Sequence, residues 1–282
     1  MSLKTVAFKH SVQIYWVVFA VRFKTLLQYR AAAIAGVITQ IFWGSIKLMI
    51  MAAFYAQATV APPITFPEVV AYVWLGQVLL GLLPWNHDPE LDQLFRTGAV
   101  AYELLRPLDL YMLWFARILA FRTAPTLLRL VPGLIFAMLL LPLIGLEEWQ
   151  LKPPEDVVTL VLFLCSMVAT VLLSCVFTIL MAGAMFWTIE GRGVASLMNG
   201  LVVVFSGMVI PLPLFPSWLQ PFLQWQPFRG LCDIPYRIYS GNIATDQAVA
   251  EITFQFGWVA ILLASTYVLF SFARQKVVVQ GG

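Results

Sequence analysis

The sequence predicts an all-helical integral membrane protein. Of its 282 residues, 61% are hydrophobic and 11% are charged, whereas soluble domains carry about 25% charged residues. Six apolar runs approach or exceed the ~20 residues that a helix needs to cross a bilayer. The length fits one membrane domain over residues 1–282 and leaves no room for a sizeable soluble domain beside it.

The six expected spans follow the ends of the apolar runs. In chain order they cover about residues 31–55, 67–85, 127–146, 157–187, 194–215 and 252–273. Three proline-rich stretches at span ends read as turns: "APPITFPE" (61–68), "EEWQLKPPED" (147–156) and "IPLPLFPSWLQPF" (210–222).

Residues 1–30 are expected to form an interfacial helix that lies on the membrane surface. The apolar core of this segment is only residues 14–21, too short for a crossing helix. At ~100° per residue, one arc of the helix collects polar side chains: Lys9, His10, Gln13, Lys24 and Gln28. Arg22 lies off this arc. The alternative is a short first span, which would invert every later loop.

The distribution of lysine and arginine favours a cytoplasmic location for both termini. With the N-terminus inside, 13 of the 17 basic residues fall in inside segments and one, Lys47, falls within a span. Only Lys152, Arg229 and Arg237 fall outside. This asymmetry follows the positive-inside rule. Because the basic residues are spread between apolar runs, they indicate topology in a lipid membrane rather than a surface for nucleic acid.

The longest polar interruption, residues 86–129, is expected inside. Asp88 is a suitable N-cap for a short helix with Pro89 at its first position. After Pro107, a second helix is expected at the inner interface, with Arg117 snorkelling and Trp114 at headgroup depth. Such a charged and amphipathic loop either docks a soluble partner or anchors to lipid headgroups, and the residues alone leave both open.

Residues 210–240 are too broken by proline to span the membrane. Irregular backbone at membrane depth survives only when protein or a water-filled path surrounds it, so an outer re-entrant helical hairpin is expected here. Its aromatic side chains either cap an exit route or form a belt at the outer headgroups: Phe215, Trp218, Phe222, Trp225 and Phe228. Asp233 and Arg237 have the four-residue spacing of a helical ion pair.

Lys47 is the only charge well inside an expected span, and intramembrane charge usually marks function. It either snorkels to the outer surface or faces a central pathway, where it would contact an anionic or polar substrate. The central parts of the spans hold no acidic residue, which argues against a proton- or sodium-driven transporter.

Motifs for catalysis are missing from the sequence. No GxxxxGK[ST] occurs, so ATP hydrolysis by this chain itself is not expected. "HDPELD" (87–92) reads as a charged helix start rather than a metal site, because the only other histidine is His10. "EGRG" (190–193) reads as a tight inner turn with a solvated Glu190–Arg192 pair.

Two stretches resemble the permease subunits of type-2 ABC exporters, in a poorly characterised bacterial branch. "LFRTGAVAYELLRPLDLYMLWFAR" (94–117) is similar to the segment after the second span of that branch. "FSGMVIPLPLFPSWLQPFLQWQPFRGLCDIPYRIYSG" (205–241) resembles the signature before the last span, where a serine-glycine pair precedes prolines and aromatic residues. The resemblance covers nearly the whole chain.

The resemblance implies a coupling role for the region 86–129. In this class the permease binds a separate cytoplasmic ATPase, in two copies, through a coupling helix after the second span; ATP and Mg²⁺ belong to that ATPase. The residues to which this role is carried over are Asp88, Glu90, Leu91, Asp92, Leu94, Phe95, Arg96, Glu103 and Arg106.

The resemblance also implies a second permease copy or a paralogous permease, and a place in the bacterial cytoplasmic membrane. Two other classes stay open on the residues alone: a secondary transporter or channel that works without an ATPase, and a membrane scaffold without transport.

Overall fold

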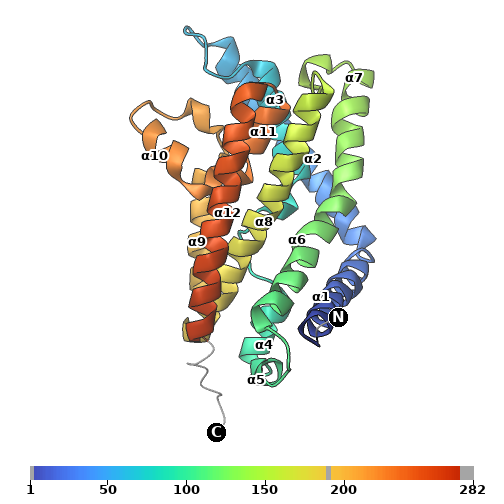
Figure 1. Ribbon diagram of the computed structural model, residues 1–282. Coiled ribbons are helices and arrows are strands. Elements are labelled where there is room, and N and C mark those ends of the chain that lie inside the picture. The colour runs from blue at the N-terminus through green and yellow to red at the C-terminus, as the bar shows by residue number, and fades with distance from the viewer. Residues whose placement is uncertain (1–2, 189–191, 274–282) are drawn as a thin grey trace.

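The computed structural model of the chain describes residues 3–188 and 192–273, and these residues form helices and connecting segments without any strand. The all-helical prediction is therefore confirmed. Four helices are long and apolar enough to cross a membrane: α2 (Arg30–Ala56), α6 with its continuation (Leu110–Leu143), α8 (Val157–Thr188) and α12 (Thr245–Ala273). They run side by side along the bundle in Figure 1.

The remaining helices are shorter or lie apart from this set. The α-helices are α1 (Leu3–Leu26), α3 (Phe66–Val78), α4 (Pro89–Arg96), α5 (Val100–Leu104), α7 (Leu141–Leu143), α9 (Arg192–Phe205), α10 (Gln220–Trp225) and α11 (Asp233–Tyr239). Single turns of other helix types are η1 (Leu80–Leu82), η2 (Phe136–Leu140), η3 (Glu147–Trp149), η4 (Leu212–Leu214) and η5 (Pro227–Leu231).

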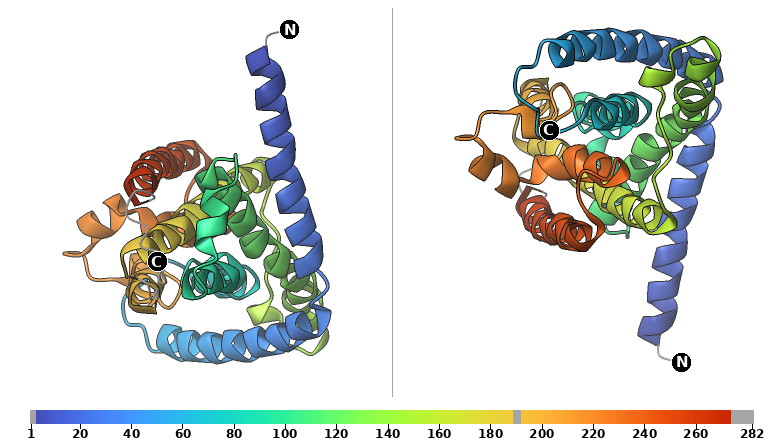
Figure 2. Two further views of the ribbon diagram at one scale, coloured as in Figure 1. Left: turned by 90° about the horizontal axis from the view of Figure 1, so that it is seen from below. Right: turned by 90° about the horizontal axis from the view of Figure 1, so that it is seen from above.

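The two ends of the bundle carry different elements. The end that holds α4 and α5, also reached by the last described turn of α12, is called the α4 end; the opposite end, with α7, is called the α7 end (Figure 1). Helix α1 appears nearly end-on in Figure 1 and at full length in Figure 2, so it lies across the bundle axis. It packs along α6, and Trp16, Val17 and Val21 remain exposed.

Helix α8 is central, since it contacts α6, α11 and α12. Four buried hydroxyl residues recur along it at four-residue spacing: Ser166, Thr170, Ser174 and Thr178. Residues four apart share one face of a helix, so α8 presents a continuous line of hydroxyl groups to the interior of the bundle.

The third expected span begins earlier than the sequence analysis placed it. It was expected from residue 127, after a separate interface helix, but α6 is one helix from Leu110. Asp109 caps it by accepting a hydrogen bond from the Met112 amide at 2.9 Å. Trp114 is 0% exposed, so its expected place at headgroup depth was wrong: the ring packs inside the bundle.

The second and fifth expected spans are not continuous helices. Helix α3 ends at Val78, and the chain continues through η1 and an irregular segment to Asn86. Helix α9 ends at Phe205, ten residues before the expected end at residue 215. Every residue of α3 from Val69 to Val78 is buried, so protein rather than lipid surrounds it, a setting in which broken backbone is tolerated.

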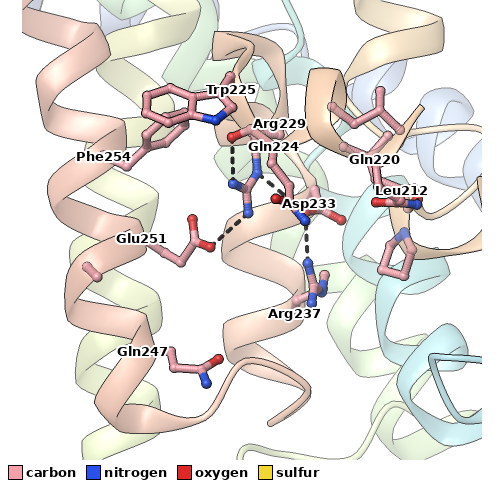
Figure 3. Close-up of a pocket in the computed structure, with 13 residues that line it drawn as sticks. Leu212, Gln220, Gln224, Trp225, Arg229, Asp233, Arg237, Gln247, Glu251 and Phe254 are labelled. Atoms are coloured by element: carbon pink, nitrogen blue, oxygen red, sulfur yellow. Dashed lines mark hydrogen bonds and ion pairs between the residues drawn. The ribbon is translucent and has the colours of Figure 1, made fainter. Parts of the chain in front are cut away.

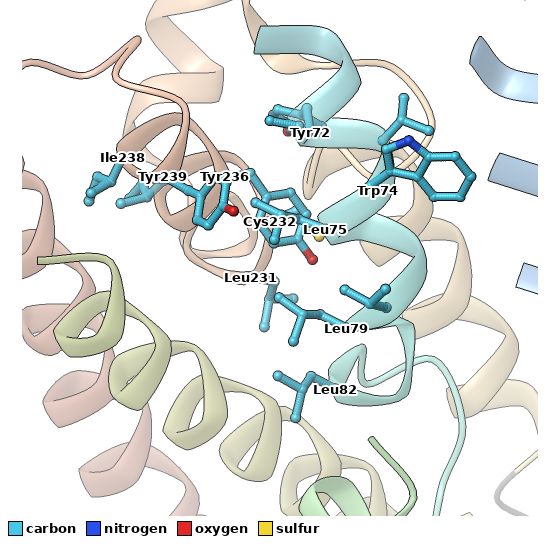
Figure 4. Packing of buried hydrophobic residues seen from close by; sticks show 14 of the residues in the cluster. Tyr72, Trp74, Leu75, Leu79, Leu82, Leu231, Cys232, Tyr236, Ile238 and Tyr239 are labelled. Atoms are coloured by element: carbon cyan, nitrogen blue, oxygen red, sulfur yellow. The ribbon is translucent and has the colours of Figure 1, made fainter. Parts of the chain in front are cut away.

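The main hydrophobic core forms where α3 meets η5 and α11. Figure 4 shows Leu75 of α3 and Leu79, the residue directly after this helix, facing Leu231, Cys232 and the side chains of α11. The rings of Tyr72 and Tyr236 meet edge to face with centroids 5.3 Å apart. The proline-rich segment 210–240 is thereby fixed against the half-helix α3.

Gly207 lies two residues after the end of α9 and sets the direction of this segment. Its φ is +87°, a conformation that side chains disfavour, and a Cβ atom there would overlap the Tyr72 hydroxyl. The preceding residue, Ser206, caps the break: its carbonyl accepts from the Asp233 amide at 3.2 Å. The serine-glycine pair therefore joins α9 to α11 through the backbone: the Ser206 carbonyl accepts a hydrogen bond from the first residue of α11, and Gly207 turns the chain.

Replacing Gly207 with alanine is expected to lower the free energy of unfolding by about 2 kcal/mol or more, from backbone strain plus the overlap with Tyr72. Thermal unfolding of the detergent-solubilised protein measures this. Gly257→Ala is the control, because Gly257 lies in α12 with open space around it and alanine favours helix. Equal unfolding temperatures for both variants would contradict the role given to Gly207.

Candidate functional site

The predicted cap of the helix at 89–96 is confirmed. Helix α4 begins at Pro89, and the Asp88 carboxylate accepts a hydrogen bond from the Glu90 amide at 3.0 Å. Asp88 is 1% exposed, so the cap is enclosed by protein rather than by solvent. A buried carboxylate needs a further partner to offset its desolvation.

Arg22 of α1 supplies that partner. One of its terminal nitrogens, Nη2, lies 2.9 Å and 2.8 Å from the two Asp88 carboxylate oxygens, and Nη1 forms an ion pair with Glu90. Helix α1 is thus clamped to the first turn of α4 by charge-assisted bonds, which are stronger than neutral ones. This pair was not predicted from the sequence, although Arg22 was the basic residue that lay off the polar arc of the first helix.

Burial and charge act in opposite directions on this pair. Burial raises the pKa of Asp88 above its ordinary value, and the positive charge of Arg22 and the amide bond offset only part of that. Burial by itself would lower the pKa of Arg22, but its bonds to Glu90 and the charges of both carboxylates outweigh burial and raise it. Arg22 therefore stays charged, and it holds the negative charges of α4 in place.

Two smaller ion-pair groups surround the clamp. Asp92 lies 2.7 Å from Arg96 Nε on the exposed side of α4. Glu103 is 5% exposed, and it pairs with Arg117 at 3.1 Å and Arg106 at 3.3 Å. Arg117 does not snorkel to headgroups as expected, because it joins α6 to α5.

The apolar side of α4 anchors it to the bundle. Leu91 is 0% exposed, and the Phe95 ring meets the rings of Trp114 of α6 and Phe186 of α8 with centroids 5.7 and 4.9 Å apart. Leu94 packs against the same cluster. A displacement of α4 would therefore displace the side chains of α6 and α8 that it contacts.

A cavity of about 630 Å³ lies beside the clamp. Its lining comes from α1, α4, α5 and α6 and includes Arg22, Glu90, Gln93, Glu103 and Arg117. Charged side chains on several elements thus converge on one groove at the α4 end.

A second buried arginine lies deeper, on α6. Arg122 is 2% exposed and donates to Thr178 Oγ1 at 2.9 Å, to the Leu83 carbonyl at 3.0 Å and to Asn86 Oδ1 at 2.9 Å. It also donates to the Asn86 carbonyl. No carboxylate lies within ion-pair distance among the described residues, so Arg122 serves the irregular segment before α4. Sequence analysis had counted it among the basic residues of an inside loop.

Near the middle of the bundle, Lys47 of α2 donates to the Met208 carbonyl at 3.0 Å. The acceptor belongs to the segment after α9, so the ammonium group points toward that segment rather than along α2 toward its C-terminal end. Lys47 and Met208 also line a cavity of about 370 Å³.

Toward the α7 end, a polar cluster joins η5, α11 and α12 (Figure 3). Arg229 pairs with Glu251 of α12 at 2.9 Å and lies 3.8 Å from Asp233. Asp233 also pairs with Arg237 at 3.3 Å, which confirms the predicted helical ion pair. A cavity of about 540 Å³ borders the cluster.

The five aromatic residues proposed for an outer gate do not form one cluster. Among the described residues, no two of their rings contact each other; Phe228 stacks on Phe177 at 4.7 Å and Phe222 meets Phe205 at 5.4 Å. Trp218 and Trp225 are 76% and 74% exposed. Phe215 is half-buried. The arrangement suits an apolar surface at least as well as a closed plug.

Comparison with known families decides the class of the protein. A family model described as "ABC-2 family transporter protein" matches residues 41–281. The chain belongs to this family. Searches of curated proteins and of solved structures returned no match. The resemblance inferred from the sequence is thus confirmed: the chain is a transmembrane permease of an ABC transporter. The match begins within α2, so α1 and its Arg22 lie before it.

The structure of the permease brings all of the predicted coupling residues to one end. All nine lie on α4, on α5 or directly beside them at the α4 end. The partners from distant elements, Arg22 and Arg117, were not assigned to that site from sequence. Glu190 and Arg192, expected as a solvated pair in the inner turn, lie outside the residues whose side chains are described.

Replacing Arg122 of the permease with leucine is expected to cost about 2 kcal/mol or more, because the Leu83 and Asn86 carbonyls lose their donors in a buried site. Thermal unfolding in detergent measures the loss. Arg129→Leu is a matched control on the same helix, since Arg129 makes no hydrogen bond among the described residues. If both variants unfold at the same temperature, Arg122 is not the support of the irregular segment.

Proposed function

We propose that this permease is the transmembrane subunit of an ATP-driven exporter that couples to a separate cytoplasmic ATPase. Two ATPase subunits would bind and hydrolyse ATP with Mg²⁺, and each permease chain would form half of the substrate pathway. The second half comes from another copy or from a paralogous permease. The membrane is the bacterial cytoplasmic membrane, with both termini inside.

The observation that carries the proposal is the Arg22–Asp88–Glu90 clamp at the α4 end. It ties a surface helix, α1, to a short charged helix, α4, whose apolar side packs on two long helices. A partner that pushes α4 would move α1, α6 and α8 together. The basic residues gathered around this end support its cytoplasmic location.

Six crossings follow if the broken elements count as spans. In this proposal α2, α6 with α7, α8 and α12 cross as continuous helices. Helix α3 with the segment to Asn86 makes the second crossing, and α9 with the segment up to α11 makes the fifth. Helix α1 lies at the inner interface, and residues 210–240 form a re-entrant hairpin on the outer side. Its aromatic residues, Phe215 to Phe228, border the exit.

ATP-driven movement of α4 would reach the pathway through two connections. One is the clamp to α1, which continues directly into α2 and therefore to Lys47. The other is the segment from α4 back to α3, which Arg122 holds against α6 and α8. Both lead to the middle of the bundle, where α3 faces η5 and α11.

Reversing the charge of Arg22 tests the proposal. Arg22→Glu places three negative groups together and is expected to reduce the ATPase recovered with the tagged permease about tenfold, a loss of about 1.4 kcal/mol in association. The measurement is an affinity pull-down from native membranes in mild detergent, with the co-purifying proteins identified and ATP hydrolysis assayed.

Two further variants separate coupling from misfolding. Arg22→Glu combined with Glu90→Arg is expected to restore much of the recovery, because Glu90 is exposed and tolerates the exchange. Arg30→Glu, on an exposed arginine at the start of α2, is expected to leave recovery unchanged. Wild-type permease recovered without any ATPase would instead favour an ATPase-independent transporter, a channel or a scaffold.

A further inference from the structure

The cavity around Lys47 combines a half-buried cation with a largely apolar lining. Its volume is about 370 Å³, within the range of small-ligand pockets. It lies between α2, α3 and the segment after α9, and is lined by Thr39, Gln40, Trp43, Lys47, Gln77, Leu80, Trp85, Met208 and Val209. Trp43 is 53% exposed, so the cavity reaches the surface of the chain.

Lys47 lacks a counter-charge in this cavity. An ammonium group has three N–H donors, and among the described residues its one acceptor is the neutral Met208 carbonyl. No carboxylate lies within ion-pair distance of Lys47 in the described parts of the chain. The residue is about 14 Å along α2 from Ala56 at 1.5 Å per residue, so it is well inside a span. An uncompensated charge at such a place is costly.

Two amides that line the same cavity as Lys47 also lack hydrogen-bond partners among the described residues. Gln40 is 6% exposed and its Nε2 has no hydrogen-bond partner. Gln77 is 4% exposed and makes no side-chain hydrogen bond among the described residues. Buried polar groups are normally satisfied, so an unpartnered amide donor next to an unpaired cation indicates a missing acceptor.

The chemistry of the missing group follows from these donors. It must accept hydrogen bonds and carry negative charge to meet Lys47 and Gln40. The rest of the lining, with Trp43, Leu80, Trp85 and Val209, favours an apolar body. Phosphate and carboxylate headgroups on an alkyl or aryl chain meet both requirements, whereas cationic and uncharged amphiphiles meet only the second.

We propose that this cavity binds the anionic headgroup of an amphiphile, with Lys47 as its charge partner and Gln40 and Gln77 as hydrogen-bond partners. The inference rests on the proposed function, because it assigns a substrate class to the pathway that α2 lines. The hydrogen-bond donors of the cavity bind the headgroup, and the alkyl or aryl chain of the amphiphile extends through the opening beside Trp43.

The experiment uses the permease with its co-purifying ATPase in phosphatidylcholine nanodiscs, titrated with radiolabelled decyl phosphate. Saturable binding is expected. Decanol and decyltrimethylammonium, which share the chain but lack the anion, are expected to compete at least tenfold more weakly. Equal competition by decanol would overturn the proposal, because the charge would then have no role.

Variants locate the binding at Lys47. Lys47→Met is expected to weaken binding at least tenfold and Gln40→Leu severalfold, whereas Lys47→Arg retains binding because the charge is kept. Lys152→Met, at a lysine outside this cavity, is the matched control. Loss of the one hydrogen bond to the Met208 carbonyl is offset by removal of a charge that has no ion-pair partner among the described residues, so the unfolding temperature of Lys47→Met is expected to stay close to wild type; this separates loss of ligand from loss of fold. Unchanged decyl phosphate binding in Lys47→Met would overturn the proposal.

A further experiment distinguishes two natural ligands that carry the same kind of headgroup, an anionic membrane lipid and a smaller anionic amphiphile. Nanodiscs that contain phosphatidylglycerol displace decyl phosphate if the natural occupant is an anionic lipid, and do not if it is a smaller amphiphile; both results keep the anionic site. Failure of decyl phosphate to bind while the ATPase remains attached would reject the inference and leave the proposed function standing. Binding of decyl phosphate by a permease that recruits no ATPase would support the anionic site and reject the proposed coupling to an ATPase.

Discussion

The fold depends on finding donors for backbone carbonyls that regular helices leave unpaired. Two irregular segments pass through the interior, one from α3 to α4 and one from α9 to α11, and no bulk water reaches the interior of a membrane domain to satisfy them. The carbonyls of Leu82, Leu83 and Asn86 accept from Ser174 and Arg122. The Gly230 carbonyl accepts from Thr170 at 2.9 Å and from Gln255 at 2.9 Å.

Helix α8 supplies two of these four donor residues, Ser174 and Thr170, which explains why so apolar a helix carries a line of hydroxyl groups. A hydrogen bond adds only about 1 kcal/mol net, but an unpaired buried carbonyl costs about 1–3 kcal/mol. Ser166 completes the arrangement by donating to Gln255 Oε1 at 2.7 Å. The main effect of the hydroxyl groups on α8 is therefore to fix the position of the irregular segments, and their net contribution to stability is small.

How much of this the sequence reveals depends on the distance along the chain between interacting residues. The Asp88 cap and the Asp233–Arg237 pair were predicted correctly because their partners lie within four residues. Arg22 and Asp88 are 66 residues apart, and periodicity carries no information about such pairs. The four-residue repeat of Ser and Thr in α8 was visible in the sequence and could have indicated that this helix faces polar backbone.

The errors in the expected spans have one physical origin. Charged residues were taken to lie in loops. The expected third span was therefore placed after Arg117 and Arg122, with its start at residue 127. In the folded chain Arg117 pairs with Glu103, and Arg122 is saturated by carbonyls, so both fit inside a bundle. The second and fifth spans were overextended for the opposite reason: apolar composition continues past Val78 and Phe205, while glycine and proline end the helices.

Arg122 and Lys47 differ in how many of their N–H donors are used as well as in burial: Arg122 is buried and Lys47 is half-buried. Arg122 uses four donor bonds to fixed acceptors on α8 and on the segment before α4, and a guanidinium group has five N–H donors in all. It has almost nothing left to offer a ligand. Lys47 uses one of three and stands beside an amide donor that has no partner. A saturated cation holds the fold together, and an unsaturated one next to an open cavity is available for binding; in this permease the first lies on the connection to α4 and the second in the cavity lined by α2.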